Sequence, residues 1–96
     1  MKAGEYNDWG ITALFYSALH YVEAALARLN IHSEDHGDRT VNIAHYLRYI
    51  NTDYGVLRNL SQDVRYDLLQ AGPTEISEAR RTFSQIKKLL ENRSAL

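Results

Sequence analysis

The spacing of apolar residues between positions 7 and 29 constrains the fold of this 96-residue chain more than any other feature. Over this stretch apolar side chains recur at intervals of three and four residues, which is the period of one face of an α-helix. The members of this face are Ile11, Leu14, Phe15, Ala18, Leu19, Val22, Ala25, Leu26 and Leu29. We therefore predict a helix over about residues 8–29, capped by Asn7 or Asp8, with this face in the core.

The opposite side of this segment is also short of charged residues. Trp9, Ala13 and Tyr16 lie there, together with His20. A helix that is apolar nearly all round is buried on both sides, and a chain of this size has few other helices to cover the second side. We therefore expect a homodimer with these four residues in its interface. His20 and Glu23 are expected to make a polar contact there, since a metal site would need further such pairs on facing helices.

Three further segments follow the same helical period, and their predicted ranges are about 36–50, 53–69 and 75–92. Their inner stripes are Ile43, Leu47 and Ile50 with Val41 and Ala44 beside them, then Tyr54, Leu57, Leu60, Val64 and Leu68, then Ile76, Ala79, Phe83, Ile86 and Leu90. No run of four or more residues alternates like a strand. The predicted fold class is all-α: a single domain over residues 1–96, folded as an antiparallel up-and-down four-helix bundle.

Capping residues define the boundaries of these segments. Asp35 is expected to cap the second helix, and Thr52 or Asp53 the third. Between the third and fourth helices, Gly72 suits a left-handed position and Thr74 is expected to cap the helix that follows. The connections are short, so neighbouring helices are expected to be antiparallel.

Composition limits the classes of function. The chain has no cysteine, which excludes disulfides and thiolate zinc sites, and we expect neither a metal site nor a cofactor. The formal net charge of −1, from 11 basic and 12 acidic residues, removes the broad attraction that drives non-specific nucleic-acid binding, so any RNA contact must be local. The apolar runs are far shorter than the ~20 residues of a membrane span, and the N-terminus lacks the apolar core of a signal peptide. We expect a cytosolic protein without a membrane partner.

The stretch HSEDHGDRTVNIAH contains three of the four histidines of the chain. Helical periodicity places His36 on the core-facing stripe of the second helix, with Arg39 one turn later on the same face. His45 faces elsewhere. A His and an Arg can supply the proton transfer and the phosphate-holding cation that metal-independent RNA cleavage needs. The alternative is a His packed at the edge of the core and bonded to a backbone carbonyl or to Asp38.

Two further groups of residues suit the binding of nucleic acid or another ligand. Arg65 and Tyr66 lie near the end of the third predicted helix, where they could hold a phosphate and stack on a base. Alternatively, the arginine could donate hydrogen bonds to the free carbonyls at the helix end. Arg48 lies between Tyr46 and Tyr49 and could form a second stacking surface with them. Interface anchors explain these tyrosines equally well.

Four segments resemble the HEPN superfamily of small helical domains: ALFYSALHYVEAALARLNIH, HGDRTVNIAHYLRYI, LSQDVRYDLLQAG and ISEARRTFSQIKKLL. The likeness covers about residues 8–91. It rests on the order of the helices, on a His near a helix start, and on an Arg-Tyr pair at the end of a later helix. In this chain the corresponding residues are His36, Arg65 and Tyr66.

The resemblance implies a HEPN-like bundle that dimerises and acts either as a binding or regulatory module, with an RNA or a nucleotidyltransferase as partner, or as a toxin-like ribonuclease. Ribonucleases of the superfamily carry an Arg followed, after four to six residues, by a His, and Arg39 and His45 have this spacing. Thr40 stands where a polar residue, often Asn, usually follows the Arg. On a regular helix the two side chains point about 120° apart and lie about 9 Å apart along the axis, so they would converge only across a dimer. A small-ligand pocket at the bundle end near His36 is the third alternative.

Overall fold

The computed structural model describes residues 3–66 and 72–94, and these ranges contain helices and no strand. The elements are α1 (Ala3–Arg28), α2 (His36–Tyr46), the short 3₁₀ helix η1 (Arg48–Ile50), α3 (Asn51–Arg65) and α4 (Pro73–Ser94). The all-α prediction with four helices is therefore confirmed. The predicted end of the third helix at residue 69 lies outside the described residues.

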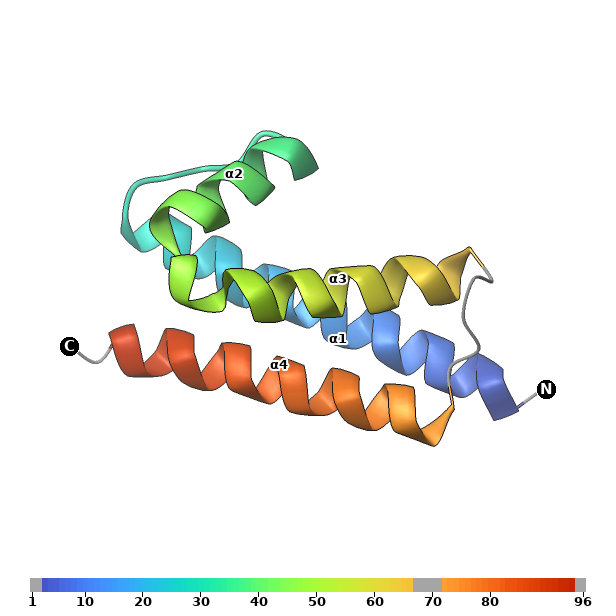
Figure 1. Cartoon of the computed structure of the whole chain (residues 1–96). Coiled ribbons are helices and arrows are strands. Elements are labelled where there is room, and N and C mark those ends of the chain that lie inside the picture. Colours follow the sequence, from blue (N-terminus) through green and yellow to red (C-terminus); the bar gives the residue numbers. More distant parts are fainter. Residues whose placement is uncertain (1–2, 67–71, 95–96) are drawn as a thin grey trace.

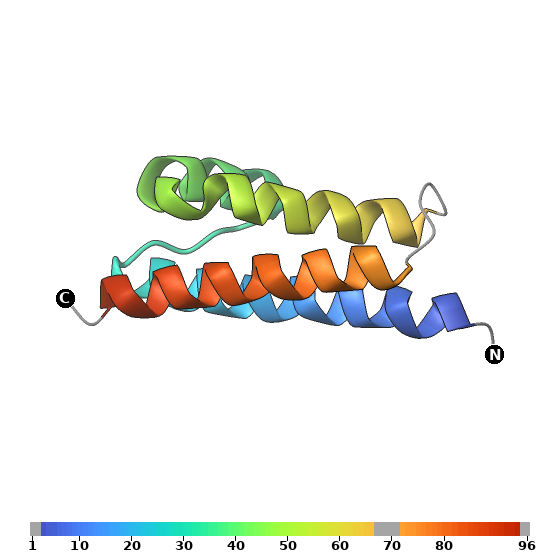
Figure 2. The same cartoon turned by 60° about the horizontal axis from the view of Figure 1, so that its bottom comes forward.

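Three long helices form the body of the molecule, and α2 lies against one end of them (Figure 1). Figures 1 and 2 show that α1 and α4 run in the same direction and that α3 runs opposite to both. α2 runs in the same direction as α1, because residues 29–35 double back before α2 begins. The up-and-down order is therefore wrong at α2. The physical reason is length: seven extended residues span about 23 Å, which exceeds the ~16 Å of an 11-residue helix.

The turn between α2 and α3 differs from the predicted helix over residues 36–50. α2 ends at Tyr46, Leu47 leaves the helical conformation (φ −126°, ψ 46°), and η1 leads directly into α3. This bend lets Leu47 and Ile50 remain buried on both sides of the turn. The N-cap position of α3 is Ile50, without a side-chain hydrogen bond, so the predicted caps Thr52 and Asp53 are wrong.

α1 begins before its predicted start and ends one residue before its predicted end. The helix extends back to Ala3, so Asn7 and Asp8 lie within it and do not cap it. It stops at Arg28, and Asn30 adopts a left-handed conformation (φ 61°) while its N–H donates to the Ala27 carbonyl at 2.9 Å. Asn tolerates this conformation better than most residues because its short polar side chain forms local hydrogen bonds.

The start of α4 also differs from the prediction. Pro73 is the first helical residue, where its missing N–H costs nothing. Gly72 precedes it without a positive φ, and its N–H donates to Oε2 of Glu75 at 3.1 Å. The carboxylate of Glu75 therefore does part of the capping that was expected of Thr74.

The predicted inner stripes supply the hydrophobic core. The buried apolar residues on them are Ile11, Phe15, Ala18, Leu19, Val22, Ala25, Leu26, Ile43, Leu47, Ile50, Tyr54, Leu57, Leu60, Val64, Ile76, Ala79, Ile86 and Leu90. Leu14 and Phe83 are partly buried against this cluster. Leu29 and Val41 are exposed instead, because the helix ends before Leu29 and Val41 lies on the outer side of α2. Ala44 is exposed too, and Leu68 lies outside the described residues.

Gly55 offers a direct test of helix propensity in α3. A Cβ added at Gly55 meets no atom within 4 Å, and its backbone is not left-handed. We expect Gly55→Ala to raise the free energy of unfolding by about 0.5–1 kcal/mol, because alanine loses less backbone entropy in a helix. Urea denaturation measures the gain. Gly10→Ala is the matched control: its Cβ meets Cδ1 of Ile76 at 3.0 Å, so a smaller gain is expected there.

Candidate functional site

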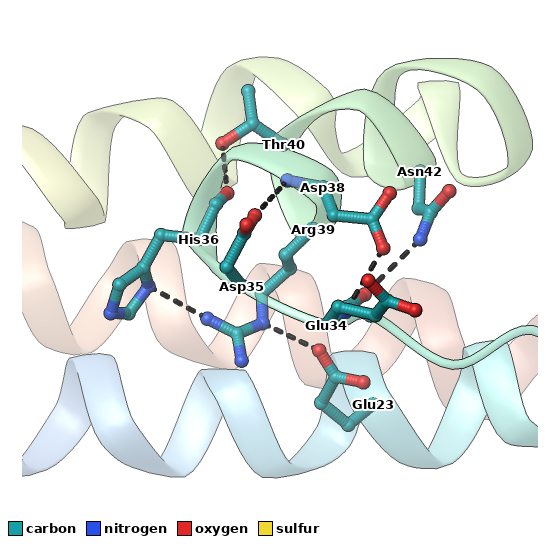
Figure 3. A network of polar contacts seen from close by, with 9 residues as sticks. Glu23, Glu34, Asp35, His36, Asp38, Arg39, Thr40 and Asn42 are labelled. Atoms are coloured by element: carbon teal, nitrogen blue, oxygen red, sulfur yellow. Dashed lines mark hydrogen bonds and ion pairs between the residues drawn. The ribbon is translucent and has the colours of Figure 1, made fainter.

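The first turn of α2 is fixed by hydrogen bonds from its own residues (Figure 3). Asp35 occupies the N-cap, and its carboxylate accepts from the Asp38 N–H at 2.7 Å, as predicted. The carboxylate of Asp38 accepts from the Glu34 N–H at 3.0 Å. These two acidic side chains also interact favourably with the positive N-terminal end of the helix dipole. The start of α2 is thereby held in one position.

Arg39 connects α2 to two other helices. Its Nε donates to Oε1 of Glu23 on α1 at 2.5 Å, and the two side chains are only 17% and 33% exposed. Its guanidinium also interacts with the Tyr54 hydroxyl on α3. Desolvation by burial lowers the pKa of Arg39, but the hydrogen bond and the charge of Glu23 outweigh it and raise the pKa above its usual value. Arg39 therefore remains charged and holds three helices together.

His36 is the third partner of Arg39. An Nη atom of the guanidinium lies 2.8 Å from Nδ1 of His36, as Figure 3 shows. Because a guanidinium can only donate, Nδ1 of His36 is the acceptor in this contact. The predicted His36–Arg39 pair is thus present as a contact. His36 is exposed and is therefore not part of the core stripe, which corrects the sequence prediction.

A groove with a volume of about 350 Å³ lies between α1, α2 and α3. Phe15 and Tyr16 line it from α1, and His36, Gly37 and Thr40 line it from α2. Phe15 is buried, whereas Tyr16 is 48% exposed, so the α1 wall is an apolar base with an aromatic edge. The α2 wall contributes polar groups from its first two turns.

The wall from α3 carries most of the charge. It consists of Tyr54, Arg58, Gln62, Arg65 and Tyr66. Arg58 donates weakly to Oγ1 of Thr40 at 3.5 Å, and Nε of Arg65 donates to the Ser61 carbonyl at 3.3 Å. None of the described residues that line the groove is Asp or Glu. In a chain with a net charge of −1, this groove is locally positive.

The groove brings together residues that were predicted separately. His36, Arg65 and Tyr66 line it, although they come from two different helices. Arg58 also lines it, and sequence reasoning did not select this residue. The available signal was its spacing of seven residues from Arg65, which places both on one face of a helix.

His45 and Arg48 do not line the groove. The ring of His45 packs edge-on against Tyr46, with ring centres 4.5 Å apart, on the exposed side of α2. Arg48 is exposed in η1. Within one chain Arg39 and His45 therefore do not share a cleft, as their helical separation predicted.

The four predicted interface residues form an exposed stripe on α1, which we call the α1 stripe: Trp9, Ala13, Tyr16 and His20. The carboxylate of Glu23 is bonded to Arg39, and the hydrogen bonds of the described residues include none between Glu23 and His20. Among the residues that the structure describes, no three His, Asp or Glu side chains are placed to hold a metal ion. No helix in this part of the chain is long and apolar enough to cross a membrane.

Comparisons with known proteins do not identify a relative of this chain. No family model matches the chain, and no curated protein or solved structure is significantly similar to it.

Tyr54 gives the network at Arg39 a pH dependence. Burial raises the pKa of Tyr54 above its usual 10.0, and the charge of Arg39 opposes this only in part. Above pH 10 the unfolded chain loses this proton while the folded chain keeps it, so folding stability falls as the pH rises through the folded pKa. We expect Tyr54→Phe to show a smaller loss of stability between neutral pH and pH ~11. Urea unfolding across this range measures it, and Tyr46→Phe, on an exposed ring, is the control.

Proposed function

We propose that this chain is a cytosolic, HEPN-like interaction module that acts as a homodimer through the α1 stripe. The observation that carries the proposal is the exposure of large aromatic side chains on this stripe: Trp9 is 74% exposed and Tyr16 is 48% exposed. Tryptophan and tyrosine are the residues that contribute most to protein interfaces. The stripe carries no acidic or strongly basic residue, so two copies of it can meet without charge repulsion.

The HEPN-like part of the proposal is supported by the positions of the residues on which the resemblance rests. His36 is the first residue of α2, and Arg65 is the last residue of α3 with Tyr66 directly after it. These are the places at helix ends that the resemblance assigns to a His and to an Arg-Tyr pair.

The dimer is tested by light scattering at high micromolar concentration. We expect the mass of two chains for the wild type and of one chain for Ala13→Glu, because the substitution puts two carboxylates into an apolar interface. Ser84→Glu, which adds the same charge on the exposed side of α4, should remain a dimer. A wild type that stays monomeric, or an Ala13→Glu variant that stays dimeric, contradicts the proposal.

A second candidate function, metal-independent RNA cleavage, is favoured by the contact between His36 and Arg39 at the positive groove. In this reaction His36 would take the proton of the attacking 2′-hydroxyl once substrate displaces Arg39 from Nδ1, Arg39 would hold the phosphate, and the departing 5′-oxygen would take a proton from water. We expect single-stranded RNA to be cut in the presence of a chelator, with a loss of at least about a hundredfold in His36→Ala. His45→Ala, outside the groove, should cut as the wild type does. Intact RNA with the wild type, or unchanged cleavage by His36→Ala, counts against this function.

A further inference from the structure

We propose that the contact between His36 and Arg39 is an acid-sensitive latch for α2: when the His36 ring takes up a second proton, α2 loosens from the bundle while α1, α3 and α4 stay packed. This regulation concerns the fold of one chain, so it depends neither on the dimer nor on RNA cleavage. Phe15 and Tyr54 are buried in the groove that the first turns of α2 border. Release of α2 therefore exposes an aromatic surface at this end of the molecule.

α2 is attached to the bundle mainly through polar contacts. Ile43 is the one buried residue among the 11 residues of α2, all of which the structure describes. α2 packs only sparsely against α1, whereas α1, α3 and α4 contact one another extensively. A helix with few buried apolar contacts opens locally at a lower free-energy cost than unfolding of the whole chain. The opening of α2 is therefore sensitive to the loss of a single polar contact.

Arg39 makes the charged contact that holds α2, and its partners fix its geometry. Its Nε donates to Oε1 of Glu23 on α1 at 2.5 Å, and its guanidinium also interacts with the Tyr54 hydroxyl on α3. Because these two partners orient the guanidinium, the Nη atom that faces His36 cannot turn away without breaking them. This Nη lies 2.8 Å from Nδ1 of His36 (Figure 3). The latch therefore needs an unprotonated acceptor at Nδ1.

A second proton on the His36 ring removes this acceptor. The imidazolium ring donates from both nitrogens and the guanidinium can only donate, so two donors and two positive charges face each other across the same contact. Either the ring or Arg39 must then move. His36 is also the first residue of α2, where the positive end of the helix dipole disfavours a cation. Both effects act on the start of α2 and loosen it.

Charged and titratable groups surround this contact on every neighbouring element. They are Glu34 before α2, Asp35, Asp38 and Arg39 at its start, Tyr16 and Glu23 on α1, and Tyr54, Arg58, Arg65 and Tyr66 on α3. The carboxylates moderate the repulsion at His36, and the two arginines on α3 add to it. Carboxylates and phenols ordinarily titrate outside about pH 5–8, which is the range in which histidine changes its charge. Within this range the latch therefore responds to the histidine.

Hydrogen exchange of the α2 amides measures the latch. Exchange is followed by NMR at about pH 7.5 and about pH 5.5, and each rate is divided by the rate of an unstructured peptide at the same pH, which removes the intrinsic pH dependence. We expect the protection of the α2 amides to fall at least about threefold at the lower pH, since the open state binds the second proton more readily than the closed state. Amides in the middle of α3 and α4 should keep their protection.

Substitutions separate the charge of His36 from that of the other histidines. His36→Gln can accept from Arg39 and is never charged, so the α2 amides should stay protected at both pH values. His36→Lys is charged at both, so their protection should be low at both. His32→Gln, before α2, and His45→Gln, near its C-terminal end, should keep the wild-type response. All three positions are exposed, and circular dichroism checks that each variant is folded.

The latch is supported by a loss of protection that is confined to α2, absent from His36→Gln and permanent in His36→Lys. Equal protection of α2 at both pH values overturns it, as does a response that survives in His36→Gln or disappears in His45→Gln. A His36→Lys variant as protected as the wild type at pH ~7.5, or a parallel loss in α3 and α4, overturns it too. The dimer and RNA cleavage can each fail without changing these results, because the exchange of α2 is measured within one chain.

Discussion

Leu57→Ala is expected to lower the free energy of unfolding by about 2–5 kcal/mol, because it opens a cavity in the middle of the core. Leu57 is fully buried on α3, and α3 packs against both α1 and α4. A domain of this size has a total stability of about 5–15 kcal/mol, so the variant loses a large share of it. Urea denaturation followed by circular dichroism measures the change in the midpoint.

Leu57→Met is the control for this substitution. It keeps nearly the same volume and apolar character, so the expected loss is below about 1.5 kcal/mol. A loss smaller than about 1 kcal/mol for Leu57→Ala would contradict the packing described above. In a close-packed interior, truncation of a fully buried leucine lowers the free energy of unfolding by more than this.

Arg39→Ala is expected to cost about 1–3 kcal/mol, which is more than an exposed arginine contributes. The substitution removes the ion pair with Glu23, and it leaves a partly buried carboxylate without its partner. It also releases His36 and the hydroxyl of Tyr54 from the same guanidinium. Since α2 contacts α1 only sparsely, the loss should appear first as looser packing of α2, measurable by hydrogen exchange of its amides.

A double-mutant cycle isolates the ion pair between Arg39 and Glu23. The coupling energy from Arg39→Ala, Glu23→Ala and the double variant is expected to exceed about 0.5 kcal/mol, because the two side chains are in direct contact. Arg58→Ala is the matched control, since its guanidinium has no carboxylate partner among the described residues. A coupling near zero would mean that Arg39 does not hold α2 in place.

Much of the fold was predictable because it depends on periodicity. The 3, 4 spacing identified four helices, and the stripes of Ile11 to Leu26 and of Ile76 to Leu90 are in the core as predicted. The errors lie at helix ends and connections. Leu47 leaves the helix although its neighbours have helical propensity, because the chain must turn there while keeping three apolar residues inside.

The candidate site was predictable only in parts. The sequence singled out His36, Arg65 and Tyr66 for their chemistry, but it gave no reason to place them together. The geometry of α2 brings His36 beside α3, and the same arrangement makes Arg58 part of the groove. Arg39 was selected as a phosphate-holding cation, whereas the structure uses its charge to join α2 to α1.

The sequence by itself determined the fold class, the core faces and the capping role of Asp35, because these follow from local propensity, residue spacing and short-range hydrogen bonds. The direction of α2, the pairing of Arg39 with Glu23 and the groove were decided only by the tertiary structure. Glu23 and Arg39 are sixteen residues apart, and the path that brings them together depends on how the segment 29–35 doubles back. Which polar groups meet across helices is therefore set by packing of the whole bundle and cannot be read from any one helix.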